Sequence, residues 1–347
     1  MVLERRQMKQ HLQSRLKEWL DAEFGASTMS TPEPIAGGQS NPTWFVEHGG
    51  RRLVLRKKPD GTLLKGAHAI EREYRVLKAL EPTDVPVPVA LALEEDPDVL
   101  GAPFYLMDRV EGRVFDDNAM PGSHPDERRA IYFSLAEALA KLHRVKPADA
   151  GLEDFGPPGN YFERQTARWT RQYQASEGPR IAELDWMCDW LAKNLPEDDN
   201  DIAIAHGDFR LGNVICAPDE PRVVAILDWE LSTLGHPLAD LGYCQIPWRS
   251  TPDQYGGISG LDLQELGIPT AAEFTDHYMK YARKTAPLEA FHKAFALFRF
   301  SVIFVGIADR VNAGTANAAD AEKLGPLGGV FARYAKETAL NAGRSTV

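Results

Sequence analysis

The chain has 347 residues and a formal net charge of −11 at pH 7. This length exceeds what one minimal core needs and favours two lobes or domains. The negative charge argues against a nucleic-acid-binding protein, because such proteins need a basic face to displace counterions from the phosphate backbone.

The cysteines and the apolar runs of the sequence indicate the cellular compartment in which the protein is expected. The three cysteines, Cys188, Cys216 and Cys244, are widely spaced and form no CxxC pair, so we expect neither a disulfide framework nor structural zinc. Residues 1–20 are charged and contain no apolar core of a signal peptide. No run of 18 apolar residues occurs in the sequence. The sequence therefore predicts a cytoplasmic monomer or homodimer without a membrane segment.

The first third of the sequence is predicted to be rich in short strands. Apolar residues at helical spacing between Glu4 and Phe24 predict an amphipathic helix. A loop over 32–42 contains Gly-Gly-Gln-Ser-Asn and precedes a predicted hairpin with a His-Gly-Gly turn. The other expected elements are hairpin strands over 43–47 and 52–56, a helix over 68–80 and a strand over 103–107.

From about residue 124 the apolar pattern is mostly helical. The predicted helices cover 125–145, 160–175, 180–194, 271–285 and 288–312. Apolar runs at 202–205 and 223–227 predict two strands that bring a polar segment to the mouth of a hairpin-like element. We therefore predict an α+β fold, with a β-rich part over 1–110 that includes an added N-terminal helix, and a mostly helical part over 111–347.

The stretch over 204–230, which overlaps both of these strands, carries the strongest functional pattern. It brings together His206, Asp208, Asn213 and Asp228 in one short span. One carboxylate can orient a substrate hydroxyl, and the asparagine and second carboxylate are hard oxygen ligands for Mg²⁺. The alternative is a turn with a buried histidine and capping side chains. We favour phosphoryl transfer, because Asp228 follows an apolar strand at the separation that a second metal ligand needs.

These motifs resemble the aminoglycoside phosphotransferase family, a branch of the protein-kinase-like fold that includes choline-kinase-like enzymes. Residues 206–213, His-Gly-Asp-Phe-Arg-Leu-Gly-Asn, are similar to its catalytic loop. Residues 226–230, Ile-Leu-Asp-Trp-Glu, resemble its metal-binding segment. The resemblance covers nearly the whole chain. It implies a bilobal fold with a β-rich N-lobe and a mostly helical C-lobe, and it implies ATP and Mg²⁺ as cofactors.

The resemblance also implies a role for each polar residue of these motifs. The implied roles are catalytic base for Asp208, Mg²⁺ ligands for Asn213 and Asp228, and further positions of the catalytic loop for His206 and Arg210. Asp240 matches the family's later aspartate, which braces the catalytic loop. A helix N-cap is another role for Asp240, and it is compatible with the bracing.

The nucleotide side is expected in the first part of the chain. The residues expected to contact ATP are Gly38, Gln39, Ser40 and Asn41 in a phosphate-covering loop, Val54 and Arg56 on one face of the next strand, Glu73 as the partner of Arg56, and Met107 and Arg109 at the hinge between lobes. Arg56 stands where kinases carry a lysine, and the two are not interchangeable. Lys58 shares its face and could replace it. Glu71 competes with Glu73, and the glycine-containing loop could be a plain turn.

The acceptor is less well defined by the sequence. Arg164, Arg168 and Arg171 share one face of a predicted helix and suit an anionic substrate if that face lines the cleft. A solvated surface is the alternative, as it is for the acidic run over 197–201. The chain is also similar to the kinase-like domain found fused to acyl-CoA dehydrogenases. That resemblance implies a hydroxyacyl-CoA or another neutral or anionic hydroxyl-bearing metabolite as acceptor.

Two other functions are less consistent with the sequence. A non-catalytic nucleotide-binding module of the same fold is supported by Arg56 alone and opposed by the complete Asp208, Asn213 and Asp228 set. A dinucleotide-binding oxidoreductase is strongly disfavoured, because no GxGxxG follows an N-terminal strand. Within the kinase hypothesis, antibiotic, choline-like and acyl-CoA acceptors all remain open.

Overall fold

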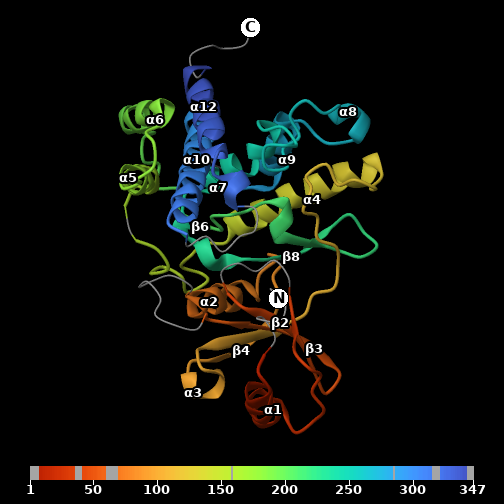
Figure 1. Cartoon of the computed structure of the whole chain (residues 1–347). Helices are drawn as coiled ribbons and strands as arrows, with labels where there is room; N and C mark the ends of the chain where they lie inside the picture. The colour runs from red at the N-terminus through yellow and green to blue at the C-terminus, as the bar shows by residue number, and fades with distance from the viewer. Residues whose placement is uncertain are drawn as a thin grey trace. The chain divides into compact units, whose positions relative to one another are not determined.

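The computed structural model describes residues 8–35, 41–59, 69–157, 159–283, 286–314 and 321–341. It divides into two compact units, which are shown in Figure 1 and described separately below. The smaller unit comprises Met1–Gly112 and Val224–Glu230. The larger unit comprises Arg113–Val223 and Leu231–Val347. The segment Val224–Glu230 groups with the smaller unit, where the Ile226 N–H donates to the Pro86 carbonyl at 2.8 Å.

A five-stranded antiparallel sheet forms the centre of the smaller unit, in the order β1-β2-β3-β5-β4. Its strands are β1 (Glu33–Pro34), β2 (Thr43–His48), β3 (Arg51–Lys57), β4 (Ala90–Glu94) and β5 (Phe104–Asp108). Strands β2 and β3 form the predicted hairpin, with Phe45 opposite Val54. Gly49 and Gly50 have φ of 58° and 79°, and two successive positive φ values are what a tight hairpin turn requires.

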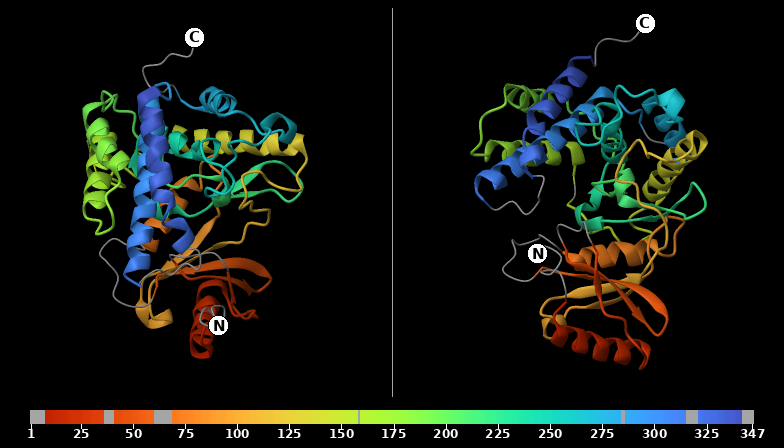
Figure 2. Two further views of the ribbon diagram at one scale, coloured as in Figure 1. Left: turned by 45° about the horizontal axis from the view of Figure 1, so that its top comes forward. Right: turned by 45° about the vertical axis from the view of Figure 1, so that its right-hand side comes forward.

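Helices cover both faces of this sheet (Figure 2, right). The smaller unit contains α1 (Gln10–Phe24), α2 (Ile70–Leu80) and α3 (Pro97–Leu100). Leu16 and Leu20 of α1 pack with Leu55 and Phe104 in one apolar cluster. Because side chains alternate along a strand, Val54 and Arg56 of β3 face the opposite side, where α2 lies. The first four residues of the predicted Glu4–Phe24 helix lie outside the described residues, and α1 begins at Gln10.

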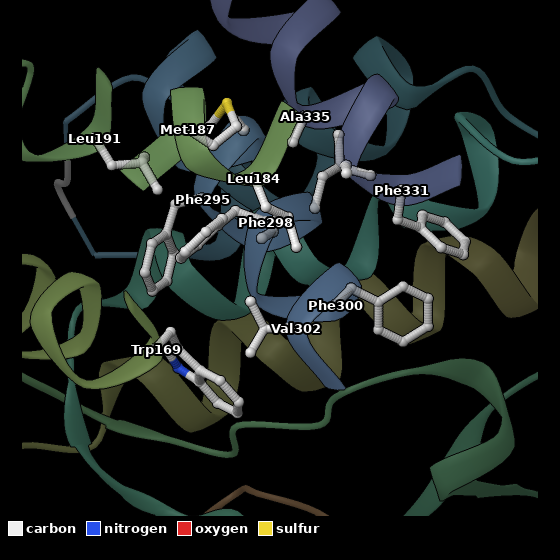
Figure 3. Close-up of a cluster of buried hydrophobic side chains, with 14 of the residues drawn as sticks. Trp169, Leu184, Met187, Leu191, Phe295, Phe298, Phe300, Val302, Phe331 and Ala335 are labelled. Atoms are coloured by element: carbon white, nitrogen blue, oxygen red, sulfur yellow. The ribbon is translucent and has the colours of Figure 1, made fainter. Parts of the chain in front are cut away.

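The larger unit is mostly helical, as predicted. Its helices are α4 (Pro125–Arg144), α5 (Tyr161–Gln174), α6 (Ala182–Lys193), α7 (Pro237–Cys244), α8 (Leu263–Leu266), α9 (Ala271–Tyr281), α10 (Ala290–Asn312), α11 (Ala321–Leu324) and α12 (Leu327–Leu340). Its core forms around α10, whose Phe295 and Phe298 pack with Trp169 of α5, Leu184 of α6 and Phe331 of α12 (Figure 3). A helix that is apolar on nearly every side belongs in such a core.

Four further short strands lie between residues 203 and 235: β6 (Ala203–Ala205), β7 (Val214–Cys216), β8 (Val223–Ile226) and β9 (Thr233–Gly235). The predicted strands at 202–205 and 223–227 correspond to β6 and β8. The expected hairpin between them is wrong, because β6 pairs antiparallel with β9, with Ile204 opposite Leu234. Even α10, with 23 residues, is not apolar enough to cross a membrane, and no other helix in the described ranges is.

Candidate active site

The loop after β6 is fixed by a buried carboxylate on α7. Asp240 accepts the His206 N–H at 2.6 Å and the Gly207 N–H at 2.9 Å. Gly207 has φ of +83°, and a Cβ at this position would lie 2.6 Å from the Leu231 carbonyl, so only glycine fits. The N-cap of α7 is His236. The N-cap role considered for Asp240 is therefore wrong, and this residue holds the loop from inside the helix.

His143 of α4 stabilises the charge on Asp240. Its Nε2 lies 3.3 Å from Asp240 Oδ2, and its Nδ1 lies 2.8 Å from the Tyr278 hydroxyl. Burial raises the pKa of Asp240, but the hydrogen bond and charge of His143, the charge of His206 and the Gly207 amide outweigh it and leave the pKa below its ordinary value. Asp240 therefore stays ionised and can accept from several donors at once.

The loop presents Asp208 with donors at both carboxylate oxygens. Oδ1 accepts the Tyr243 hydroxyl at 2.6 Å, and Oδ2 accepts Asn213 Nδ2 at 2.8 Å. Arg210 Nε lies 3.6 Å from Oδ2. His206 is fully buried, and its Nδ1 accepts the Asp208 N–H at 3.2 Å. The larger unit thus brings four of the predicted loop residues into one network.

Tyr243 was missed in the sequence analysis. It follows Asp240 by three residues on α7, and residues three apart lie on the same helix face. That spacing was the signal in the sequence that could have identified Tyr243. A fully buried helix shows no amphipathic pattern, so the pattern of apolar residues could not single out this tyrosine.

In the smaller unit, Arg56 bridges two carboxylates. Its Nε lies 2.7 Å from Glu73 Oε2, and its Nη2 lies 3.0 Å from Asp228 Oδ1. Asn41 Nδ2 donates to Glu73 Oε1 at 2.8 Å. Lys58 pairs instead with Glu71 at 3.2 Å. The two alternatives considered for Arg56 and Glu73 therefore form a separate ion pair with each other.

Burial governs the ionisation of this cluster. It raises the pKa of Glu73 to about 7, against the opposing charge of Arg56 and with the negative charges of Asp228 and Glu230 adding to the rise. Burial also disfavours the charged form of Arg56, but the negative charges around it, with Glu73 the largest and Asp228 and Glu230 among the others, outweigh the burial and raise its pKa. Arg56 therefore remains a cation between two acidic groups.

Asp228 has an unusual backbone. Its φ is +63°, in the left-handed region that residues other than glycine rarely adopt. Such strain of about 1–3 kcal/mol persists where the surrounding structure enforces it, often at functional sites.

Asn213 of the larger unit and Asp228 of the smaller unit each carry an oxygen of the kind that a magnesium ion prefers. The Asn213 amide nitrogen also donates to the Asp208 carbonyl at 2.8 Å, which leaves the amide oxygen as the atom able to ligate. Asp228 uses Oδ1 for Arg56, and its second oxygen can serve a metal. Neutral and anionic oxygen ligands are what Mg²⁺ prefers.

Within the described part of the chain, one other group of acidic residues and a histidine lies close enough together to be considered as a metal site. Asp199, Asp201 and His236 have potential ligand atoms within 4.8 Å of one another. However, His236 Nδ1 accepts the Leu238 N–H at 3.2 Å, so its proton sits on Nε2 and points to Asp199. Asp201 is paired with Arg283. The run 197–201 was expected to be an exposed loop, and its residues are exposed apart from the half-buried Asp201.

The remaining nucleotide candidates lie in the smaller unit, except for three that fall outside the described residues, Gly38, Gln39 and Ser40. Val54 pairs with Met107 across β3 and β5. The Arg109 N–H donates to the Arg52 carbonyl at 3.0 Å, and its guanidinium lies 4.0 Å from the centre of the Phe45 ring. The N–H of Arg109 is thus engaged in the sheet, and contacts of Met107 and Arg109 with adenine stay predictions.

The three arginines of α5 do not share one environment. Arg164 is half-buried and lines a cavity of about 700 Å³ together with acidic residues such as Glu153 and Asp199. Arg168 and Arg171 are exposed, and the guanidinium of Arg168 lies 5.5 Å from the Trp169 ring centre. No residue of the catalytic loop lines that cavity among those described.

A second cavity, of about 310 Å³, adjoins the catalytic loop. Arg210, Tyr243, Tyr255 and Phe300 contribute to its lining. Tyr255 is 42% exposed, and its φ is +63°. Its ring contacts Phe300 edge-on at 5.2 Å. The lining of this cavity therefore combines three aromatic rings with polar residues, and it carries one arginine, Arg210, and one aspartate, Asp116.

Comparisons with known proteins agree with this geometry. The model of the phosphotransferase enzyme family matches residues 31–274. The chain is 39% identical over 338 residues to acyl-CoA dehydrogenase family member 10 of Mus musculus, and the alignment covers 95% of the chain and 31% of that protein. The chain thus spans about a third of that relative's length.

Solved structures show the same fold. A putative aminoglycoside phosphotransferase from Ralstonia eutropha is 43% identical, with a TM-score of 0.87, over 96% of this chain and 99% of that one. A thermostable mutant of aminoglycoside phosphotransferase APH(4)-Ia, in ternary complex with AMP-PNP and hygromycin B, is 14% identical with a TM-score of 0.63, over 95% and 99% of the two chains. The predicted kinase-like fold, with a sheet-containing N-lobe and a helical C-lobe, is confirmed.

Proposed function

The chain belongs to the phosphotransferase enzyme family, and from this premise we propose that it transfers the γ-phosphate of ATP to a hydroxyl of a small molecule with the help of Mg²⁺. The observation that carries this proposal is the Asp208 carboxylate, which is held at both oxygens on a loop braced by Asp240. A carboxylate fixed in this way can orient an acceptor hydroxyl for attack on phosphorus.

In the proposed reaction, the acceptor oxygen forms a bond to the γ-phosphorus while the bond from phosphorus to the bridging oxygen of ADP breaks. The acceptor proton passes to a carboxylate oxygen of Asp208. Asn213 and Asp228 would hold Mg²⁺, which would offset the negative charge of the phosphates. Arg210, 3.6 Å from Asp208 through its Nε, would supply positive charge beside the transferred group.

Arg56 is proposed to hold the α- and β-phosphates. Its pairing with Glu73 is the arrangement that fixes the corresponding lysine in kinases. An arginine in this position therefore gives little support to a non-catalytic nucleotide-binding module. Val54, Asn41 and the hinge residues Met107 and Arg109 are proposed to complete the nucleotide site.

The acceptor is proposed to be a neutral or anionic metabolite, with a hydroxyacyl-CoA as one candidate. The three aromatic rings in the cavity beside the catalytic loop support an acceptor with an apolar body. The charged residues of the lining are Arg210 and Asp116, so the cavity offers a polycation no excess of negative charge. The name of the mouse relative, which refers to acyl-CoA, agrees with this class.

A coupled assay of ADP release tests the proposal. The purified chain is incubated with Mg·ATP and a panel of hydroxylated metabolites, which includes hydroxyacyl-CoAs, choline and kanamycin. We expect one class of acceptor to stimulate ADP release, and EDTA to abolish it. Asp208→Asn should lower turnover by roughly 10²-fold or more, as expected when a positioned base is lost. An unstimulated wild type, or an Asp208→Asn variant with normal turnover, would sink the proposal.

A further inference from the structure

Tyr243 makes a short contact with the residue proposed to handle the acceptor hydroxyl. Its phenol lies on α7 and donates to Asp208 Oδ1 at 2.6 Å. We infer that Tyr243 is a positioning residue that fixes the Asp208 carboxylate in one orientation for the acceptor. This inference rests on the proposed function, since it assigns a task within the same site.

The Tyr243 ring is itself held from two sides. It meets the Phe300 ring at 5.7 Å with an interplanar angle of 88°, and the Arg299 guanidinium lies 5.1 Å from its centre. Arg299 also donates to the Gly207 carbonyl. Side chains of α10 therefore hold both Tyr243 and the loop that carries Asp208, so the hydroxyl meets the carboxylate at a set position.

The phenol of Tyr243 remains a donor at physiological pH. Burial raises its pKa well above the ordinary value, and the charge of Asp208 acts in the same direction. Hydrogen bonds to ionised groups are also among the stronger ones in proteins. A neutral phenol facing a carboxylate therefore gives a persistent contact.

Both oxygens of the Asp208 carboxylate accept a hydrogen bond, and this restricts the orientation of the carboxylate. Tyr243 occupies one lone pair of Oδ1, and Asn213 occupies one of Oδ2 at 2.8 Å. Rotation of the carboxylate would break both bonds, while each oxygen keeps a second lone pair for the acceptor hydroxyl. If Tyr243 were purely structural, its hydroxyl would stabilise the fold, and the effect of removing it would not depend on Asp208.

Kinetics separate these two roles. Tyr243→Phe keeps the ring and removes the hydroxyl, and we expect kcat for acceptor phosphorylation to fall roughly tenfold while the KM for ATP is unchanged, as for loss of one hydrogen bond to a charged group. In an Asp208→Ala background the same change should cost little. Tyr173→Phe is the control, because Tyr173 is also buried and donates to the Ile181 carbonyl at 3.1 Å. An equal loss from Tyr243→Phe with and without Asp208 would overturn the inference.

A measurement independent of turnover distinguishes failure of this inference from failure of the proposed function. The ten tyrosines are replaced by 3-fluorotyrosine, and the Tyr243 signal is identified by its absence in Tyr243→Phe. Asp208→Ala should shift this ¹⁹F resonance and leave that of Tyr173 in place. If ADP release fails with every acceptor but the resonance shifts, the proposed function falls and the contact stands. If the resonance stays in place, the inference is overturned whatever the activity.

Discussion

The guanidinium of Arg56 lies 3.0 Å from the carboxylate of Asp228, although 172 residues separate them in the chain. This contact places the proposed phosphate-binding cation and a proposed metal ligand in one cluster with Glu73. Its consequence for nucleotide binding can be tested residue by residue.

Arg56→Ala should raise the KM for ATP by roughly tenfold or more, because a charge-assisted contact to phosphate is lost. Arg56→Lys should recover only part of the loss, since an ammonium lacks the two-pronged fork. Lys58→Ala is the control, because it breaks only the half-exposed pair with Glu71. Steady-state kinetics with varied ATP give all three values. A larger defect in Lys58→Ala would transfer the phosphate role to Lys58.

The raised pKa of Glu73, about 7, predicts a pH effect on ATP binding. Above pH 7 the carboxylate is ionised and holds Arg56; below pH 7 it is increasingly protonated and the ion pair weakens. We therefore expect the KM for ATP to rise as the pH falls from 8 to 6. Glu73→Gln has no carboxyl group to titrate at this position, so its KM for ATP should be high at every pH. Any pH dependence that remains in this variant measures the titration of the nucleotide itself. Parallel pH profiles for the two proteins would contradict the prediction.

Elements with strong periodicity were predictable from the sequence. The helix predicted over 288–312 corresponds to α10 (Ala290–Asn312). It was predictable because a long apolar segment in a buried core has few alternatives to a helix. The strand alternation that placed Val54 and Arg56 on one face also agrees with the Arg56–Glu73 pair. Local pattern was sufficient in both cases.

Long-range pairings were not predictable in the same way. The partner of β6 is β9, whose three residues, Thr233–Gly235, are too short to show a strand period. Asp228 joins the sheet-containing unit through contacts such as that of Ile226 with Pro86, which no local pattern encodes. Tyr243 was missed for a related reason, because its partner Asp208 lies 35 residues away.

Removal of the proposed metal ligands should weaken Mg²⁺-dependent nucleotide binding. Asp228→Ala should have the larger effect, because it removes a charge as well as a ligand, whereas Asn213→Ala removes a neutral oxygen. Titration calorimetry of each variant with ATP, with and without Mg²⁺, measures the difference. Unchanged Mg²⁺ dependence in both variants would place the metal on other residues.

Asp240 should be important for stability as well as activity. Asp240→Ala leaves two backbone N–H groups and His143 without their acceptor in a buried site. We expect the free energy of unfolding to fall by about 3 kcal/mol or more, since each buried donor left unsatisfied costs about 1–3 kcal/mol. Urea unfolding of Asp262→Ala, which removes an exposed N-cap of α8, should show a loss of only about 1 kcal/mol. Similar losses in the two variants would contradict the buried-brace role.

The character of the acceptor is tested at Tyr255. Asparagine tolerates a positive φ, so Tyr255→Asn removes one of the three aromatic rings of the cavity beside the catalytic loop, at a residue with φ of +63°, without adding strain. We expect this variant to raise the KM for the acceptor roughly tenfold, in line with loss of about 1–2 kcal/mol of apolar contact, and to leave the KM for ATP unchanged. Tyr255→Phe keeps the ring and should behave like the wild type.

Kanamycin should be a poor acceptor throughout, because the lining of the cavity contains both Asp116 and Arg210 and offers a polycation no excess of negative charge. Whether α5 contributes to acceptor binding is tested with Arg164→Ala, Arg168→Ala and Arg171→Ala. A raised KM for the acceptor in one of these variants would indicate that the replaced arginine contacts the substrate. An unchanged acceptor KM in Tyr255→Asn would show that the acceptor binds outside this cavity, and efficient phosphorylation of kanamycin would contradict a neutral or anionic acceptor.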